Sequence, residues 1–364
     1  MHAADVALSV LLAAIIVVSL LANVLVLVCF VYNAEIRRQV PGLFVLNLTC
    51  CNLLLASSNM PLTVAGLLGH APPPGGHVLC QLAAFLDTFL TSNSMLSMAA
   101  LSIDRWVAVV FPLSYHSRMR RRDAVLALAY AWLHSLGFAV APACLSWLDY
   151  HRPTASCTLY SPEARASSRA HFAAYTVALH ALTFLLVLVV LCVTYLKVLQ
   201  VARFHCKRID VITMQTLVLL VDIHPSVRQR CLEEQRKRRQ RATRKISTFI
   251  GTFVICFTPY VLTRVVELFV AVPISPYWGV LCKSLAYSKA ACDPFVYSLL
   301  RHQYRQTCRD IINRFLKRRS LNTSGQRQEN GKVKKPVNSG KSEISEIKPE
   351  KPDKEGKTGT GSAV

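Results

Sequence analysis

The sequence predicts an all-α membrane protein, a seven-transmembrane helix bundle that is followed by a short amphipathic helix 8. Of its 364 residues 52% are hydrophobic and only 17% are charged, which is too apolar for a soluble domain of this size. Seven apolar runs are each long enough to cross a bilayer, for which about 20 residues suffice. The net charge of +22 comes from residues between these runs and in the tail. Because these residues do not cover one face of a folded domain, nucleic-acid binding is not predicted.

The predicted bundle covers residues 7–300, and residues 1–6 precede it. The first run is too long and lacks the basic leader of a cleaved signal peptide, so we expect a retained signal anchor. The seven runs lie at 7–32, 42–68, 79–110, 124–147, 171–200, 243–270 and 277–300.

The distribution of Lys and Arg predicts the orientation of the bundle. The loops after the first, third and fifth runs contain Arg37 and Arg38, four arginines within 118–122, and the basic run 236–245. Loops rich in Lys and Arg stay in the cytoplasm. The chain is therefore expected in the plasma membrane as a multi-pass protein with an extracellular N-terminus.

Cysteine positions predict one disulfide. Most of the 13 cysteines lie inside the apolar runs or on the cytoplasmic side. Cys80 opens the third run and Cys157 lies in the second outer loop, both facing an oxidising compartment where a disulfide persists. The alternative is two unpaired small hydrophobic side chains.

The cytoplasmic segments have three distinct compositions. The long loop at 201–242 contains an apolar stretch, 211–221, that is too short to span; it could extend the fifth helix, lie in the interface or cover a partner site. Residues 301–318 alternate apolar and basic side chains, which is typical of an interfacial amphipathic helix. Residues 319–364 cannot form a core and are predicted to be a disordered tail. Its serines could be targets of kinases and, through them, of arrestin. The basic run 236–245 is expected to attract anionic lipid and to meet a partner protein.

The end of the third run carries the motif that points to a family. Asp104-Arg105-Trp106 is followed by Pro112-Leu113-Ser114-Tyr115, and the seventh run contains Asp293-Pro294-x-x-Tyr297. Together with Asn23, Trp132, Pro142 and the stretch "FVICFTPY", these motifs resemble the rhodopsin-like (class A) G protein-coupled receptors over residues 7–316. Longer stretches such as "YSKAACDPFVYSLLRHQYR" resemble orphan receptors of this family.

The resemblance implies a receptor that activates a heterotrimeric G protein, leaning toward the stimulatory type that activates adenylate cyclase and raises cyclic AMP. In that mechanism Asp104 holds Arg105 at rest, and release of Arg105 opens a gap for the partner. The other positions of this activation switch are Tyr195, Arg239, Phe253, Phe257, Pro259, Asp293, Pro294 and Tyr297.

Two departures from the family pattern predict signalling without a ligand. An acidic residue often lies twenty positions before the proline of the sixth helix, here Pro259, and helps to hold the arginine. This sequence has Arg239 there, whose like charge cannot hold Arg105. The usual tryptophan two residues before that proline is Phe257.

A second group of residues predicts a central polar site. Receptors of this family commonly bind Na⁺ with an aspartate on the second helix and an asparagine on the seventh. Here the two residue types are exchanged, as Asn52 and Asp293, and Ser94 falls at the position of a serine ligand. Lys289 lies one turn from Asp293 and could neutralise it in place of Na⁺. Alternatively Lys289 reaches the outer surface, or Asp293 takes up a proton. Asn23 completes the predicted site.

The candidate ligand pocket centres on Asp87, eighteen residues before Arg105. Amine receptors carry an aspartate at this position, and Tyr287 matches the tyrosine that often bonds it. Arg264 could act as an internal counter-ion of Asp87, or Glu267 could hold it away. A structural or self-activating role for Asp87 is preferred over binding of a small cation, and Tyr260 completes the candidate pocket. The ligand is therefore unknown or absent.

Two other classes of protein are less compatible with the sequence. A vertebrate-type retinal photoreceptor needs its lysine where this chain has Tyr287, and Lys289 is about 200° away around the helix. An intramembrane enzyme or ion carrier would need a motif such as a His/Glu metal cluster or repeated halves, and neither is apparent. No enzymatic activity, cofactor or metal is predicted.

Overall fold

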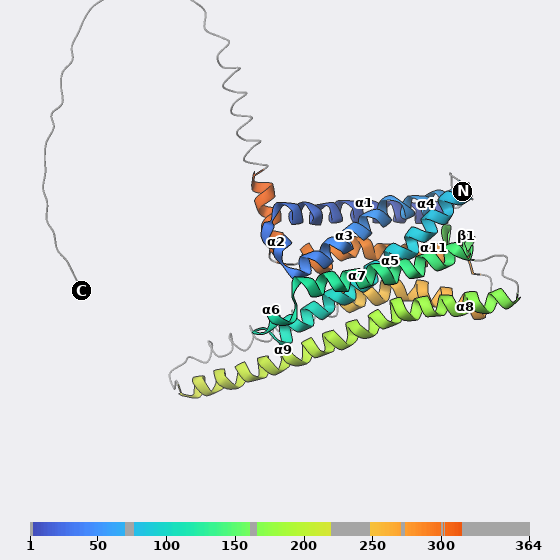
Figure 1. The fold of residues 1–364 in the computed structure, drawn as a ribbon. Coiled ribbons are helices and arrows are strands. Elements are labelled where there is room, and N and C mark those ends of the chain that lie inside the picture. The colour runs from blue at the N-terminus through green and yellow to red at the C-terminus, as the bar shows by residue number, and fades with distance from the viewer. Residues whose placement is uncertain are drawn as a thin grey trace, which may run out of the picture. The chain divides into compact units, whose positions relative to one another are not determined.

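The helices of the bundle follow the seven apolar runs. The computed structural model describes residues 3–69, 76–160, 166–219, 248–270, 274–299, 301 and 303–314, and the chain divides after Ile311 into two units. In the first unit the long helices lie side by side (Figure 1). The predicted seven-helix class is confirmed. The spanning elements are α1 (Ala3–Tyr32), α3 with α4 (Val40–Ser57, Asn59–Leu67), α5 (Gly76–Val110), α7 (Arg121–Cys144), α8 with α9 (Ala166–His180, Leu186–Leu219), the helix Thr248–Phe269, and α11 (Pro276–Asp293).

Hydropathy separates these helices into two kinds. Five of them are long and apolar enough to cross a membrane by composition, namely Ala3–Tyr32, Val40–Leu67, Arg121–Cys144, Arg169–Val201 and Thr248–Phe269. The other two, α5 and α11, carry buried ionisable side chains: Asp87 and Asp104 on α5, and Lys283, Lys289 and Asp293 on α11. The two less apolar helices therefore supply most of the charges of the interior.

Three of the helical paths are locally irregular. The second span breaks at Ser58, three residues before Pro61, a residue that cannot donate a backbone hydrogen bond. The fifth span contains a π-helical turn, η2 (Ala181–Leu185). The seventh continues as a second π-helical turn, η3 (Pro294–Leu299), that begins at its proline. Turns of this kind are frequent at functional sites.

A short hairpin closes one end of the bundle and was not predicted. Strand β1 (Leu148–His151) pairs antiparallel with β2 (Ser156–Leu159), and the 3₁₀ turn η1 (Arg152–Thr154) joins them. The N-terminal end of α1 lies at this same end, whereas the short helices α2 (Ala34–Arg38) and α6 (Tyr115–Arg118) lie at the other (Figure 1). We call these the hairpin end and the α6 end.

The predicted disulfide is present and fixes the hairpin to the bundle. Cys80 in the first turns of α5 is bonded to Cys157 of β2, with 5.3 Å between the two Cα atoms. All four residues of β2 are buried. The bond therefore holds a buried strand across the end of the helices.

The interior consists of closely packed aliphatic and aromatic side chains. The largest fully buried side chains include Tyr304, Phe44, Phe253 and Met98. Lipid is as apolar as these residues, so close packing contributes more to helix association here than removal from water does.

Two cytoplasmic predictions fall partly outside the described residues. The apolar stretch that begins at residue 211 continues helix α9 as far as Leu219, which is the first of the three alternatives. A helix spans 303–314 within the predicted 301–318. The basic run 236–245, with Arg239, and the predicted disordered tail 319–364 lie outside the described residues.

Replacement of Gly279 by alanine is expected to destabilise the protein, because α11 meets the hairpin turn at this residue. A Cβ atom on Gly279 would overlap the backbone carbonyl of Pro153. Overpacking of this kind typically costs about 1–3 kcal/mol of unfolding free energy.

The matched control is Gly137→Ala on α7, where nothing lies within 4 Å of an added Cβ. Alanine favours a helix by roughly 0.5–1 kcal/mol over glycine, so this variant should melt at the same or a higher temperature. Equal melting temperatures for the Gly279 variant and the parent protein would contradict the contact.

Candidate functional site

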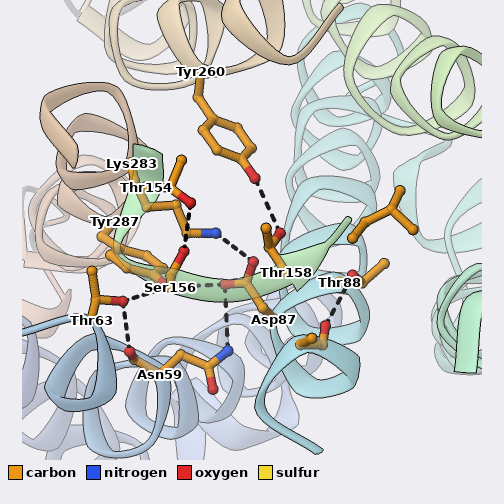
Figure 2. A network of polar contacts seen from close by, with 12 residues as sticks. Asn59, Thr63, Asp87, Thr88, Thr154, Ser156, Thr158, Tyr260, Lys283 and Tyr287 are labelled. Carbon is orange, nitrogen blue, oxygen red and sulfur yellow. Dashed lines mark hydrogen bonds and ion pairs between the residues drawn. The ribbon is translucent and has the colours of Figure 1, made fainter. Parts of the chain in front are cut away.

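An ion pair between two helices forms the centre of the site near the hairpin end. Lys283 Nζ on α11 lies 2.5 Å from Asp87 Oδ2 on α5. The other carboxylate oxygen accepts hydrogen bonds from Tyr287 at 3.1 Å and from Asn59 at 3.4 Å. Figure 2 shows the four side chains converging from three helices. Both oxygens of the buried Asp87 carboxylate are therefore engaged by the protein itself.

Lys283 was not among the predicted site residues. The sequence did offer a signal, since Lys283 precedes Tyr287 by four residues and so shares its helical face. The prediction instead considered Arg264 as the counter-ion of Asp87. Of the two lysines of α11, only Lys289 lies one turn from an acidic residue, Asp293, in the sequence.

Arg264 is buried but has different partners. Its guanidinium donates to the carbonyl of Leu159 on β2 and forms an ion pair with Glu267. Glu267 is also 2.7 Å from His151 Nε2. The structure thus matches the alternative in which Glu267 holds Arg264 away from Asp87, and the counter-ion role is wrong.

Strand β2 lies next to the same site. The hydroxyl groups of Thr158 and Tyr260 are 3.4 Å apart, so the strand reaches the helix Thr248–Phe269 (Figure 2). Lys283 Nζ lies 4.8 Å from the ring centre of Tyr260 and 4.9 Å from that of Tyr287. The ammonium group is therefore surrounded by one carboxylate and two aromatic rings.

The central polar residues are brought together as the sequence suggested. Lys289 forms an ion pair with Asp293 one turn further along α11. Asn52 donates to Asp293 Oδ2 at 3.2 Å and lies 3.4 Å from Asn23 Oδ1. Ser94 is buried and lines the same space as Asn52 and Lys289. Both oxygens of the buried Asp293 carboxylate are therefore engaged by side chains of the chain itself.

A single cavity connects the two lysine pairs. The empty space along it is about 850 Å³, part of which is open to solvent, and it extends from Asp87 and Lys283 to Asn52 and Lys289. Strand β2, through Thr158 and Leu159, forms part of its wall. The remaining polar lining includes Thr88, Thr91, Ser92, Ser94, His180, Thr183 and Tyr260.

The predicted switch residues lie toward the α6 end. Arg105 Nη2 is 3.1 Å from Asp104 Oδ2, and the Tyr115 hydroxyl donates to Asp104 Oδ1 at 2.7 Å. The Asp104 side chain is fully buried, whereas that of Arg105 is 39% exposed. Burial, and then the bonded carboxylate, raise the pKa of Tyr115. The arginine is thus held on one side and accessible on the other.

Aromatic rings connect three of the spans below the cavity. Phe249 packs against Tyr195 and Tyr297, with 4.5 Å between ring centres in each case. One turn further along the same helix, Phe253 contacts Phe257 at 5.3 Å. All five side chains are buried. Of the other predicted switch residues, Pro259 lies in the helix Thr248–Phe269 and Pro294 opens η3.

Comparison with known proteins identifies the family. The family model for 7 transmembrane receptors of the rhodopsin family matches residues 22–297. The chain belongs to the rhodopsin family of seven-transmembrane receptors. This family consists of G protein-coupled receptors and is not an enzyme family. The receptor is accordingly a multi-pass plasma-membrane protein whose partner is a G protein.

Three curated relatives cover most of the receptor. G-protein coupled receptor 26 of Homo sapiens is 69% identical over 308 residues, which is 85% of this chain and 90% of that protein. Its counterpart from Mus musculus is 66% identical over 325 residues, or 89% and 96% of the two chains. G-protein coupled receptor 78 of Homo sapiens is 51% identical over 309 residues, or 85% and 84%. These matches confirm the resemblance to receptors of this family that the sequence indicated.

The stability of the receptor is expected to fall in acid because of His151 on β1. Burial lowers the pKa of His151, and nearby Arg264 lowers it further, although Glu267 opposes them. A histidine with a lowered pKa favours folding above its unfolded value of about 6.5, and that contribution is lost as pH falls. We expect the melting temperature of the purified receptor to decrease between about pH 6.5 and 5.5.

The melting temperature of a His151→Gln variant should decrease less over this pH range. The difference corresponds to at most about 1.4 kcal/mol of unfolding free energy per pH unit. His116 on α6 is exposed, so His116→Gln serves as the matched control and should keep the slope of the parent. If the melting temperature depended on pH equally in all three proteins, the role of His151 would be contradicted.

Proposed function

We propose that the receptor activates a heterotrimeric G protein in the absence of an added ligand. The observation that carries this proposal is the state of Arg105, which has an acidic partner in its neighbour Asp104 among the described residues and a half-exposed side chain. The position from which a second acid often holds this arginine is Arg239 in the sequence. A single partner on the same helix is a weaker restraint than two, because the remainder of the Arg105 side chain stays open to solvent.

The proposed orientation places the hairpin end outside the cell. The Cys80–Cys157 bond at this end is stable in an oxidising compartment. The arginines at 37 and 38 and those within 118–122 belong to the α6 end, as expected for cytoplasmic loops. This orientation makes the N-terminus extracellular and directs Arg105 toward the cytoplasm, where the partner is.

Activation is proposed to begin with release of Arg105 from Asp104. The ring stack of Tyr195, Phe249 and Tyr297 joins the fifth, sixth and seventh spans beside this pair. A displacement of the helix Thr248–Phe269 separates these rings and opens a gap that a terminal helix of the G protein can enter. Activation of the G protein thus corresponds to a change between two packings of the same side chains.

The stimulatory G protein and a rise in cyclic AMP are proposed as the output, on the resemblance to the orphan receptors alone. The tail beyond residue 319 contains serines, so kinases and arrestin are proposed as further partners. Phosphates on such a segment create strong acceptors for basic surfaces.

A ligand-gated receptor for amines is the second candidate function. It is favoured by the position of Asp87, which lines the cavity beside Tyr260 and Tyr287. A dry carboxylate requires a cation. Lys283 already supplies that cation. Binding of an amine ligand therefore requires Lys283 to be displaced from Asp87.

Lys289 is proposed to take the place of the sodium ion of related receptors. Its ammonium group neutralises Asp293, and Asn52 occupies the helix-two position at which the charged sodium ligand is common. Removing the charge of Asp293 in this way leaves no net negative site for a cation. Sodium is therefore expected to have little effect on basal signalling.

Basal signalling is tested by measuring cyclic AMP against the number of receptors at the cell surface, with no ligand added. We expect cyclic AMP to rise in proportion to receptor number. Arg105→Ala should abolish the rise while still reaching the surface, because the variant lacks the group that the G protein engages. Lys197→Ala, at an exposed lysine of α9, provides an expression-matched control. A flat response of the parent receptor would contradict the proposal.

The role of Lys289 is tested by the effect of Na⁺ on basal signalling in membranes. Lys289→Met should make the signal sodium-sensitive, since Asp293 then lacks a counter-ion. Lys289→Met combined with Asn52→Asp restores two carboxylates and should give the larger sodium effect. A Lys289→Met receptor no more sensitive to Na⁺ than its parent would reject the replacement.

A further inference from the structure

The surroundings of Lys283 have the composition of a binding site for a primary amine. The side chain is 3% exposed, and Nζ lies 2.5 Å from Asp87 Oδ2. The rings of Tyr260 and Tyr287 lie within 5 Å of the same atom. A carboxylate and aromatic faces are the groups that bind organic ammonium ions, through charge and through the ring quadrupole. In this protein the ammonium ion belongs to the chain itself.

The hydrogen bonds of Asp87 show that this arrangement is complete. Tyr287 and Asn59 donate to Oδ1, and Lys283 occupies Oδ2 (Figure 2). Tyr287 receives a further contact from Thr63 at 3.5 Å, which orients its hydroxyl. Three of the roughly four acceptor sites of the carboxylate are therefore taken by described groups of the chain, and Lys283 already balances its charge.

We propose that Lys283 is the built-in occupant of an alkylammonium site formed by Asp87, Tyr260 and Tyr287, and that it excludes amine ligands. A free amine entering the cavity would place two cations beside one carboxylate. Such like-charge contact is strongly unfavourable in a space largely removed from water. Lys283 thereby decides which class of ligand this site can bind. The receptor with Lys283 rejects cationic amines, and a receptor without this side chain accepts an amine in the vacated space.

The size of the accepted amine follows from the side chain that is removed. Replacing Lys283 by alanine deletes three methylene carbons and the ammonium group. The molecule of matching length and charge is the n-propylammonium ion. It can reach Asp87 through the cavity, which extends past Lys283 toward Thr158 and Tyr260.

The test uses the melting temperature of the purified full-length receptor with and without n-propylammonium chloride. Lys283→Ala should melt below the parent, because Asp87 is left buried without a counter-ion. Added n-propylammonium should raise its melting temperature in a saturable manner, as a ligand that binds only the folded state does. The parent receptor should not respond, and sodium chloride at equal concentration controls for ionic strength.

Two further samples separate site binding from general effects of the amine. Lys197→Ala loses an equivalent but exposed side chain and should not respond to n-propylammonium. Neutral 1-propanol should not replace the amine in Lys283→Ala, because it cannot pair with the carboxylate. An unchanged melting temperature of Lys283→Ala in the amine, or an equal rise in the parent, would overturn the proposal.

If Lys283→Ala yields no folded receptor, exchange of the two charges decides the question. Asp87→Lys places two cations together, and adding Lys283→Glu restores an opposite pair. A double variant that melts above Asp87→Lys supports the pairing, and one that melts at or below it overturns the proposal.

The proposal rests on the proposed function only in treating the cavity as a ligand site. Melting temperature needs no G protein, so a receptor without basal cyclic AMP would leave this test intact.

Discussion

The pairing of buried charges is the constraint on which the rest of this structure depends. An unpaired ion in the centre of an apolar bundle costs several kilocalories per mole. Each buried cation described near the cavity therefore has an acid beside it: Arg264 has Glu267, Lys283 has Asp87, and Lys289 has Asp293. The Lys283–Asp87 pair fixes which faces of α5 and α11 meet, since a rotation of either helix would separate these two charges.

The hairpin belongs to this network of charges. Leu159 accepts from Arg264, and His151 bonds to Glu267, so both strands contact the same ion pair. Gly279 brings α11 against the turn between the strands, and the disulfide attaches β2 to α5. The hairpin, α5 and α11 are therefore held together by a covalent bond, by close backbone packing and by buried polar contacts. A change in the position of α11 has to be accommodated by the hairpin as well.

The sequence was sufficient for the spans and for contacts close along the chain. Hydropathy located the seven helices, and Lys289–Asp293 is an i,i+4 pair within one helix, so its spacing implied contact. The pairing of the adjacent Asp104 and Arg105 was implied by the family resemblance. The Asp87–Lys283 pair joins residues 196 positions apart, and no local pattern specifies how two helices are rotated against each other. The sequence left Arg264 undecided between Asp87 and Glu267 for the same reason: its partners include a carbonyl of a hairpin that hydropathy does not reveal. The π-helical turn at Ala181–Leu185 likewise depends on tertiary packing, because no proline marks it.

The two lysine pairs differ in what a helix movement does to them. Lys289 and Asp293 lie on the same helix, so their contact is kept when α11 shifts as a rigid body. Lys283 and Asp87 lie on different helices, so the same shift lengthens their contact and leaves two buried charges less well compensated. Only an interaction that differs between two states can bias the equilibrium between them. The Lys283–Asp87 pair can therefore favour one arrangement of α5 and α11 over another. The Lys289–Asp293 pair neutralises Asp293 in either arrangement. Asp87, Lys283 and Lys289 line one cavity. An occupant that replaces Lys283 at Asp87 would change that bias without disturbing the charge balance around Asp293.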